Sequence, residues 1–259
     1  MKIATFNANS VRSRLDAILT WLAGEAPDVL CIQETKTPDA SFPALALRGA
    51  GYHSAFRGEK SYNGVAILSR EAPREVAFGF DDGGPPDETR LMCARFGEVH
   101  VVNTYVPQGR LIDHEMYAYK LEWFRRLRSY FDRRFKPTSN VVWVGDLNVA
   151  PEPADVHNPE RQKKHVCFHD DVRAAFADTV SWGFVDVLRQ HHPEPGQFTF
   201  FDYRTPNAVD RGMGWRIDHI LATTPMSERC TDACIDIEPR KQPRPSDHTY
   251  LTACFTVLI

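Results

Sequence analysis

The sequence predicts a strand-rich α/β fold. Nine short segments combine β-branched residues with alternating or continuous apolar character, which is typical of strands. Three longer segments carry apolar residues at the spacing of amphipathic helices. A chain of 259 residues in this class is long enough to bury a sizeable core as one unit. We therefore expect a single domain over residues 1–259.

The expected elements follow one another with short connections. Strands are expected at residues 2–7, 28–33, 52–56, 64–69, 91–96, 99–106, 140–144, 217–222 and 249–257. The first helix follows from Val11, Leu15, Ile18 and Leu22 on one face and is expected to close at Gly24. Further helices are expected at residues 117–135 and 171–181. The Gly- and Pro-rich segments 81–87 and 151–164 predict loops.

Composition excludes several classes of protein. With 31 basic and 34 acidic residues the net charge is −3, so any contact with nucleic acid must be local. The 6 cysteines form no C-x-x-C pair, which argues against a zinc knuckle and favours a reducing compartment. No apolar run approaches the ~18 residues of a membrane span. We expect a cytoplasmic protein with no membrane partner.

Polar side chains gather at the ends of the predicted strands. Four expected strands lead into Asn7, Glu34, Tyr105 and the pair Asp146 and Asn148. Asp218 and the Ser246-Asp247-His248 triplet stand where other strands begin. If those strands run antiparallel to the first group, all these positions share one sheet edge.

Four carboxylates at one edge repel one another, so a packing role is improbable and a cation would relieve the repulsion. Oxygen ligands without cysteine suit Mg²⁺, with Mn²⁺ as a substitute. Asp146 and Asn148 are two residues apart, which points both side chains the same way in an extended segment. His248, beside Asp247 and opposite Asp218, would then be oriented by a carboxylate and donate to a phosphate oxygen.

Each of these residues alone also fits an ordinary structural role. Asn7 fits a turn, Glu34 a solvated helix start, and Tyr105 a strand aromatic with its hydroxyl at the rim. Gly145-Asp146 fits a turn, and His248 a structural histidine. The structural explanation weakens when all of them fall at one predicted edge.

The motifs resemble those of the exonuclease III family of apurinic/apyrimidinic (AP) endonucleases, within the endonuclease/exonuclease/phosphatase superfamily. The resemblance covers nearly the whole chain, and the order of GDLN, WRID and SDH makes it specific. The matching segments are FNANSVRSR from Phe6, IQETK from Ile32, YNGVAIL from Tyr62, NTYVPQG from Asn103, VGDLNVAP from Val144, DVHNP from Asp155, GFVDVLR from Gly183, FTFFDYR from Phe198, GWRIDHIL from Gly214 and SDH from Ser246.

The resemblance implies a four-layered α/β sandwich, with two mixed β-sheets face to face, helices outside and one catalytic domain. It implies that Glu34 is the chief metal ligand, supported by Asn7 and Asp247, with Asp146 and Asn148 close enough to share the metal; Asn9 is a further candidate. Asp146 would activate the attacking water, and Asn148 and Tyr105 would position the phosphate. His248, braced by Asp218, would contact the scissile phosphate.

The activity implied is Mg²⁺-dependent hydrolysis of double-stranded DNA by a monomer. The enzyme would cut 5′ to an abasic site or remove 3′-terminal nucleotides and blocking groups, leaving a 3′-hydroxyl. Phe200, Trp215 and Ile217 match the family's pocket for a flipped, base-less sugar, although core packing also explains them. Arg12, Arg90, Arg216 and residues 161–164 are candidates for phosphate contacts, or else solvated surface.

Departures from the family leave the balance of activities open. Phe200 and Phe201 stand where relatives carry tryptophan, and Met213 and an added glycine lie in the loop that closes the pocket. Two other functions remain as alternatives: a phosphoesterase acting on RNA or a phospholipid headgroup, and an inactive DNA-binding module. The inactive module would lack metal ligands, which are all present in this sequence.

Overall fold

Runs of buried apolar residues build the central strands. β1 (Lys2–Asn7), β2 (Val29–Gln33) and β8 (Val141–Asp146) are buried along almost their whole length, because both faces of each strand are covered. β1 pairs with β2 in parallel, and β8 pairs in parallel with β7 (Val99–Tyr105). These two parallel pairs lie in different sheets.

The computed structural model describes residues 1–257, and its strands form two six-stranded sheets in the orders β11-β12-β1-β2-β4-β3 and β5-β6-β7-β8-β10-β9. The other strands are β3 (His53–Arg57), β4 (Val65–Ser69), β5 (Glu75–Phe78), β6 (Leu91–Phe96), β9 (Phe184–Asp186), β10 (Asp218–Thr223), β11 (Cys230–Asp236) and β12 (Tyr250–Phe255). Both sheets mix parallel and antiparallel pairs, as expected.

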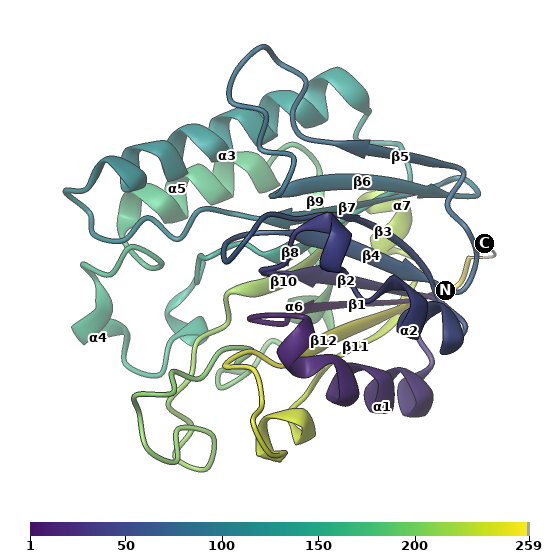
Figure 1. Cartoon of the computed structure of the whole chain (residues 1–259). Helices are drawn as coiled ribbons and strands as arrows, with labels where there is room; N and C mark the ends of the chain where they lie inside the picture. The colour runs from purple at the N-terminus through teal and green to yellow at the C-terminus, as the bar shows by residue number, and fades with distance from the viewer. Residues whose placement is uncertain (258–259) are drawn as a thin grey trace.

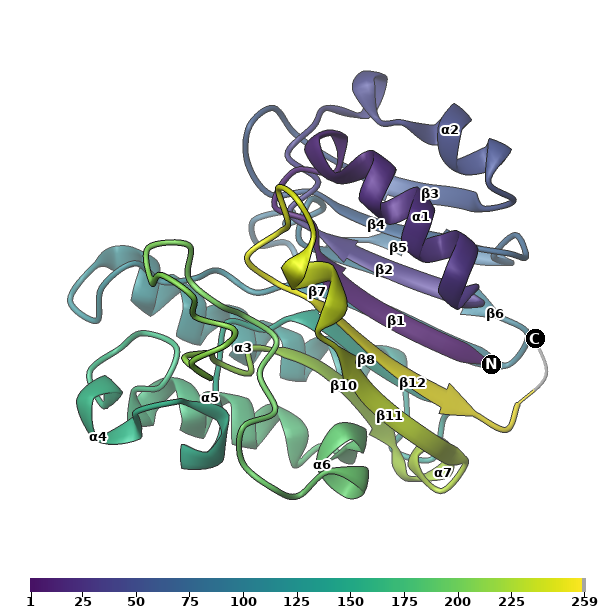
Figure 2. The same ribbon diagram turned by 90° about the horizontal axis from the view of Figure 1, so that it is seen from below.

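Helices cover the outer face of each sheet (Figures 1 and 2). The α-helices are α1 (Leu15–Glu25), α2 (Ala44–Gly49), α3 (Glu115–Arg134), α4 (Pro159–Gln162), α5 (Asp170–Val180), α6 (Val187–His191) and α7 (Thr224–Ser227). The 3₁₀ turns are η1 (Arg12–Arg14), η2 (Asp39–Ser41), η3 (Pro153–Asp155) and η4 (Glu238–Lys241). Within residues 1–257, no helix has both the length and the apolar character to cross a membrane.

Three apolar layers hold the sandwich together. The layer between the sheets includes Ile3, Cys31 and Val142. A second layer packs α1 against the first sheet through side chains such as Trp21. A third packs α3 and α5 against the second sheet, with Trp123 completely buried. The predicted four-layered α/β sandwich is confirmed.

The sequence located nine of the twelve strands in residues 1–257 to within a few residues and missed three. β5 and β11 expose much of their length, and β9 has only 3 residues, so none of them carries a clear apolar run. The first helix was expected to end at Gly24, but it extends to Glu25. It ends there because the next residue, Ala26, takes the left-handed conformation, with φ 42°. The predicted loop 151–164 contains η3 and α4.

Strand direction brings the polar strand ends together. β12 is antiparallel to β1, and β10 is antiparallel to β8, so these strands begin where their neighbours end. Tyr105 and Asp218 both pair with Asp146 in the register. The prediction of a single sheet edge was wrong in one respect: the polar residues occupy the same end of two facing sheets.

Candidate active site

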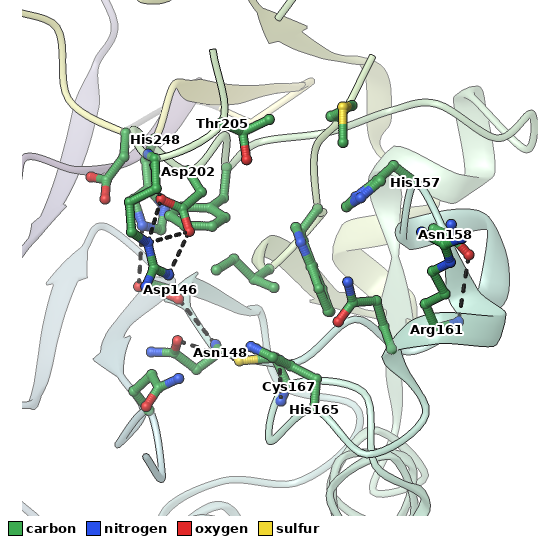
Figure 3. Close-up of a pocket in the computed structure, with 18 of the residues that line it drawn as sticks. Asp146, Asn148, His157, Asn158, Arg161, His165, Cys167, Asp202, Thr205 and His248 are labelled. Carbon is green, nitrogen blue, oxygen red and sulfur yellow. Dashed lines mark hydrogen bonds and ion pairs between the residues drawn. The ribbon is translucent and has the colours of Figure 1, made fainter. Parts of the chain in front are cut away.

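A cavity of about 640 Å³ opens at this end of the sandwich. Figure 3 shows Asp146, Asn148 and His248 on one side of it and Asn158 and Arg161, from the region of α4, on the other. Of the residues expected in the site, the cavity is lined by Glu34, Tyr105, Asp146, Asn148, Phe200, Trp215, Ile217, Asp247 and His248. Asn7 and Asp218 lie directly behind this wall and bond to residues in it.

Asn7 joins two acidic residues from different sheets. Its Nδ2 donates hydrogen bonds to Glu34 Oε1 at 2.9 Å and to Asp146 Oδ2 at 2.8 Å. Its Oδ1 accepts a hydrogen bond from the backbone N–H of Asn9. The structure therefore assembles the carboxylate cluster, while a role of Asn7 as a metal ligand stays a prediction.

Asp146 and Asn148 form a tight turn at the end of β8. The backbone N–H of Asn148 donates to Asp146 Oδ1 at 3.0 Å, and Asn148 Nδ2 donates to the carbonyl of Val106 at 2.9 Å. Position 145 must be glycine, because a Cβ there would lie 1.9 Å from the carbonyl oxygen of Thr104. This close approach fixes the end of β8 against β7.

His248 and Asp218 form a buried ion pair. His248 Nδ1 lies 2.8 Å from Asp218 Oδ2, and Nε2 lies 3.8 Å from Asp146 Oδ2. The other Asp218 oxygen, Oδ1, is buried and has no hydrogen-bond partner among residues 1–257. The structure thus braces the imidazole as expected and directs its second nitrogen toward Asp146.

The buried charges raise the pKa of both central groups. Burial, together with the nearby carboxylates of Asp218 and Glu34, raises the pKa of Asp146 to about 7, although the His248 charge opposes this. Burial works against a charged His248, but the carboxylates of Asp218 and Asp146 outweigh it and raise the pKa of the imidazole to about 10. At neutral pH the His248 ring is therefore protonated and can donate hydrogen bonds from both nitrogens, and Asp146 has the proton affinity that a general base needs.

The residues around Glu34 fit a divalent cation. Lys36 Nζ lies 2.6 Å from Glu34 Oε2 and donates to Asn9 Oδ1, and Asn9 Nδ2 donates to Asp247 Oδ1 at 3.0 Å. Burial favours a neutral Glu34, but the charge of Lys36 and the Asn7 hydrogen bond lower its pKa. Ligand atoms of Asp146, Asp218 and His248 also lie within 4.8 Å of one another. Oxygen donors dominate this set, which suits a hard metal ion.

The aromatic side chains form an apolar wall beside the acids. Phe200, Trp215 and Ile217 line the cavity, and the Phe200 ring centroid lies 4.9 Å from that of His248. Met213 also lines the cavity, whereas Phe201 packs with Phe198 in a separate small cluster. Of the two replacements by phenylalanine, only Phe200 lies in the cavity wall.

The prediction that Arg216 contacts a DNA phosphate was wrong. Arg216 is 1% exposed, and its guanidinium pairs with Asp155 at 2.6 Å and with Asp186 at 2.6 Å. Trp215 and Ile217, its neighbours in sequence, face the cavity instead. Side chains alternate along an extended segment, so a residue between two that face the cavity points into the protein.

Replacing Arg216 with methionine is expected to lower the free energy of unfolding at pH 7 by about 3–5 kcal/mol, because Asp186 would lose its buried arginine and Asp155 would keep only Arg189. Arg216 lowers the pKa of both Asp155 and Asp186, against the effect of burial. The two ionised aspartates therefore stabilise the fold above their unfolded-state pKa near 3.8. This stabilisation is lost as the pH falls through their lower folded-state pKa values. Urea unfolding should show a gap between wild type and variant that narrows below pH 4.

The exposed pair of Arg125 with Glu122 on α3 offers a control, and Arg125→Met should change stability little. If both changes lowered the free energy of unfolding equally, the buried ion pairs of Arg216 would stabilise the fold no more than an exposed pair does.

The remaining basic candidates are placed differently from one another. Arg12 is exposed at η1 and lies outside the cavity wall. Arg90 is half-buried, with its guanidinium carbon 4.7 Å from the Tyr105 ring centroid, and donates to Asn63 Oδ1. Arg161 lines the cavity. Phosphate binding by Arg12 and Arg90 stays a prediction.

Burial raises the pKa of Tyr105 well above its usual value, and the charges of Glu34 and Asp146 add to this effect. Its hydroxyl is therefore protonated and available as a donor.

Sequence reasoning missed part of the far wall of the cavity. His157, Asn158 and His165 line it without having been given a role, whereas Gln162 lies in the stretch 161–164 that was expected to contact phosphate. The DVHNP motif contains two of them, so the motif was a usable signal. Lys36, from IQETK, was likewise quoted as part of a motif without a role of its own.

Comparison with known proteins agrees with this arrangement. The chain is 30% identical to exodeoxyribonuclease III of Haemophilus influenzae, over 98% of this chain and 100% of that protein. An AP endonuclease structure from Archaeoglobus fulgidus is 52% identical, with a TM-score of 0.97 over 99% of this chain and 100% of that one. A 3′ phosphatase from Neisseria, bound to a product DNA hairpin, is 38% identical, with a TM-score of 0.93 over 99% and 100% of the two chains.

Two facing sheets with acids and a paired histidine at one end define a metal-dependent phosphoesterase. The pattern of the endonuclease/exonuclease/phosphatase family matches residues 4–248, and the chain belongs to that family. Its similarity to exodeoxyribonuclease III and AP endonucleases confirms the predicted resemblance and the prediction of a phosphodiester hydrolase of DNA repair.

Proposed function

We propose that this chain is a Mg²⁺-dependent exodeoxyribonuclease III and AP endonuclease, working as a monomer with one catalytic domain. It hydrolyses double-stranded DNA 5′ to abasic sites, or removes 3′-terminal nucleotides and blocking groups, and leaves a 3′-hydroxyl. The main support is one observation: Glu34, Asp146, Asp247 and His248 meet at a single cavity beside an apolar wall. Relatives named for each of these activities lend further support.

The metal would be held on the Glu34 side of the cluster. Glu34 would be the chief ligand, with Asn7, Asp247, Asp146 and Asn148 in support. We favour this side over the group of Asp146, Asp218 and His248, because a protonated His248 has no lone pair to offer a metal, whereas the Glu34 side offers oxygen donors alone. A bound Mg²⁺, or Mn²⁺ in its place, stabilises the negative charge that develops on the phosphate.

The protein's own groups supply the proton transfers and the positioning. Asp146 orients a water molecule and takes its proton as the water attacks phosphorus in line with the leaving 3′ oxygen. The bond from phosphorus to that oxygen breaks, its electron pair stays on the 3′ oxygen, and this oxygen takes a proton from solvent to give the 3′-hydroxyl. The protonated His248 donates a hydrogen bond to a phosphate oxygen, as do Asn148 and Tyr105. Asp218 holds the His248 ring in place.

The apolar wall would select the substrate. Phe200, Trp215 and Ile217 offer a surface against which a flipped sugar without a base can lie. Arg161, on the opposite side of the cavity, would contact the DNA backbone.

The wild-type protein is expected to incise a duplex that contains one abasic-site analogue when Mg²⁺ is supplied. Removing divalent ions with EDTA should lower the rate by at least about 100-fold, and Mg²⁺ or Mn²⁺ should restore it. A denaturing gel of the labelled strand measures both rates. Absence of cleavage with either ion would refute the proposed function, and preferential hydrolysis of RNA or of a phospholipid headgroup would move the enzyme to another branch of the family. The same gel with blunt-ended and 3′-phosphate duplexes measures the balance of activities.

A further inference from the structure

A buried lysine on α3 lies behind the proposed site. Lys120 is 0% exposed, and its Nζ donates hydrogen bonds to the carbonyl oxygens of Asn148 at 2.6 Å, Val166 at 2.8 Å and Gln108 at 3.1 Å. None of the ion pairs found in the described part of the chain involves Lys120. Burying an ammonium group without a carboxylate costs free energy, and the hydrogen bonds to these three carbonyls offset part of that cost.

The three carbonyls belong to three loops that each contribute to the cavity wall. Gln108 follows β7, Asn148 follows β8, and Val166 precedes Cys167 in the segment before α5; Gln108, Asn148 and Cys167 line the cavity. Cys167 Sγ lies 4.0 Å from Lys120 Nζ and 3.8 Å from Asn148 Oδ1. One ammonium group therefore ties together three segments that are separate in the sequence.

The contact with Asn148 leads directly to the proposed general base. Asn148 has a left-handed backbone, with φ 50°, a conformation that its surroundings must support. Its carbonyl is held by Lys120, and its N–H donates to Asp146 Oδ1 at 3.0 Å. A shift of the Asn148 backbone would therefore change the orientation of the Asp146 carboxylate.

We propose that Lys120 is a positioning residue for phosphodiester hydrolysis: it holds the backbone of Asn148, and through it the Asp146 carboxylate, in the reactive orientation. This inference rests on the role of Asp146 in the proposed function. Lys120 itself does not line the cavity, so it acts through the backbone of Asn148 and not on the substrate.

The first test compares two buried cations of the same helix. Arg126 is 6% exposed, pairs with Asp82 and Asp87, and donates to the carbonyl of Pro85, away from the cavity. Lys120→Met and Arg126→Met should both lower the midpoint of urea unfolding. Only Lys120→Met should lower kcat on an abasic-site duplex, by about 10- to 100-fold, with KM changed less than about 3-fold. Equal kcat values for the two variants would overturn the proposal.

The second test is a double-mutant cycle with Asp146→Ala, measured by single-turnover incision. If Lys120 acts by orienting Asp146, Lys120→Met should cost no more than about 2-fold once that carboxylate is gone. The full 10- to 100-fold loss in the Asp146→Ala background would overturn the proposal. Should Lys120→Met fail to fold, Lys120→Gln retains two N–H donors and takes its place in the same cycle. A wild-type protein that cuts no DNA would refute the proposed function instead, so the two failures are distinguishable.

Discussion

Replacing Asp146 with asparagine is expected to lower the single-turnover rate of abasic-site incision by about 10²- to 10⁴-fold, the range that a positioned general base contributes. Asparagine keeps an oxygen for the backbone N–H of Asn148 but cannot take a proton from water. The measurement is the rate of product formation with enzyme in excess over DNA, at saturating Mg²⁺.

The same change should leave the fold at least as stable as the wild type. Burial and neighbouring carboxylates raise the pKa of Asp146, which means that its ionised form costs free energy in the folded protein. A neutral amide removes that cost, although it weakens the contact with Asn7. Urea unfolding in EDTA should therefore show an unchanged or higher midpoint.

A matched control is available on the exposed face of α3. Asp132 is 58% exposed and pairs loosely with Arg128 at 3.6 Å. Asp132→Asn should leave both the rate and the unfolding midpoint unchanged. An Asp146→Asn enzyme that retained more than about a tenth of the wild-type rate would remove Asp146 from the role of general base.

Local sequence patterns were sufficient to predict where the strands that carry the candidate catalytic residues end. The strands before Asn7, Glu34 and Asp146 are buried apolar runs, so their ends were visible in the sequence. The meeting of Asp218 with Asp146 was expected only on the condition that its strand runs antiparallel, and β10 does run antiparallel to β8. What the residues alone did not give was the division of these strands between two sheets, because sheet membership depends on long-range pairing.

Charged residues were harder to place than apolar ones. Arg216 and Arg161 looked alike in the sequence, yet one is enclosed by two aspartates and the other lines the cavity. An arginine is found in either setting, and the partners that enclose Arg216 come from distant segments. Lys120 gave no signal at all, because its partners are backbone carbonyls and no residue type marks them.

Replacing His248 with alanine is expected to lower the incision rate by about 10²- to 10³-fold, because a preorganised donor to the developing phosphate charge is lost. The carboxylates of Asp218 and Asp146 raise the pKa of the imidazole to about 10 despite its burial, so the wild type keeps this donor charged throughout the neutral range. The rate with excess enzyme on the abasic-site duplex is again the measurement. His53→Ala, at an exposed position on the edge strand β3, should retain the wild-type rate.

Replacing Asp218, the ion-pair partner of His248, tests whether its charge acts on the reaction through His248. Asp218→Asn preserves the shape of the side chain and a hydrogen-bonding oxygen but removes the charge that favours the protonated ring. Its effect on the rate should be smaller than that of His248→Ala, and the double variant should be about as slow as His248→Ala alone, because the two residues act as a unit. If the two losses multiplied instead, Asp218 would act on the reaction by a route that does not pass through His248, and its unpartnered Oδ1 would be the atom to examine as a metal ligand.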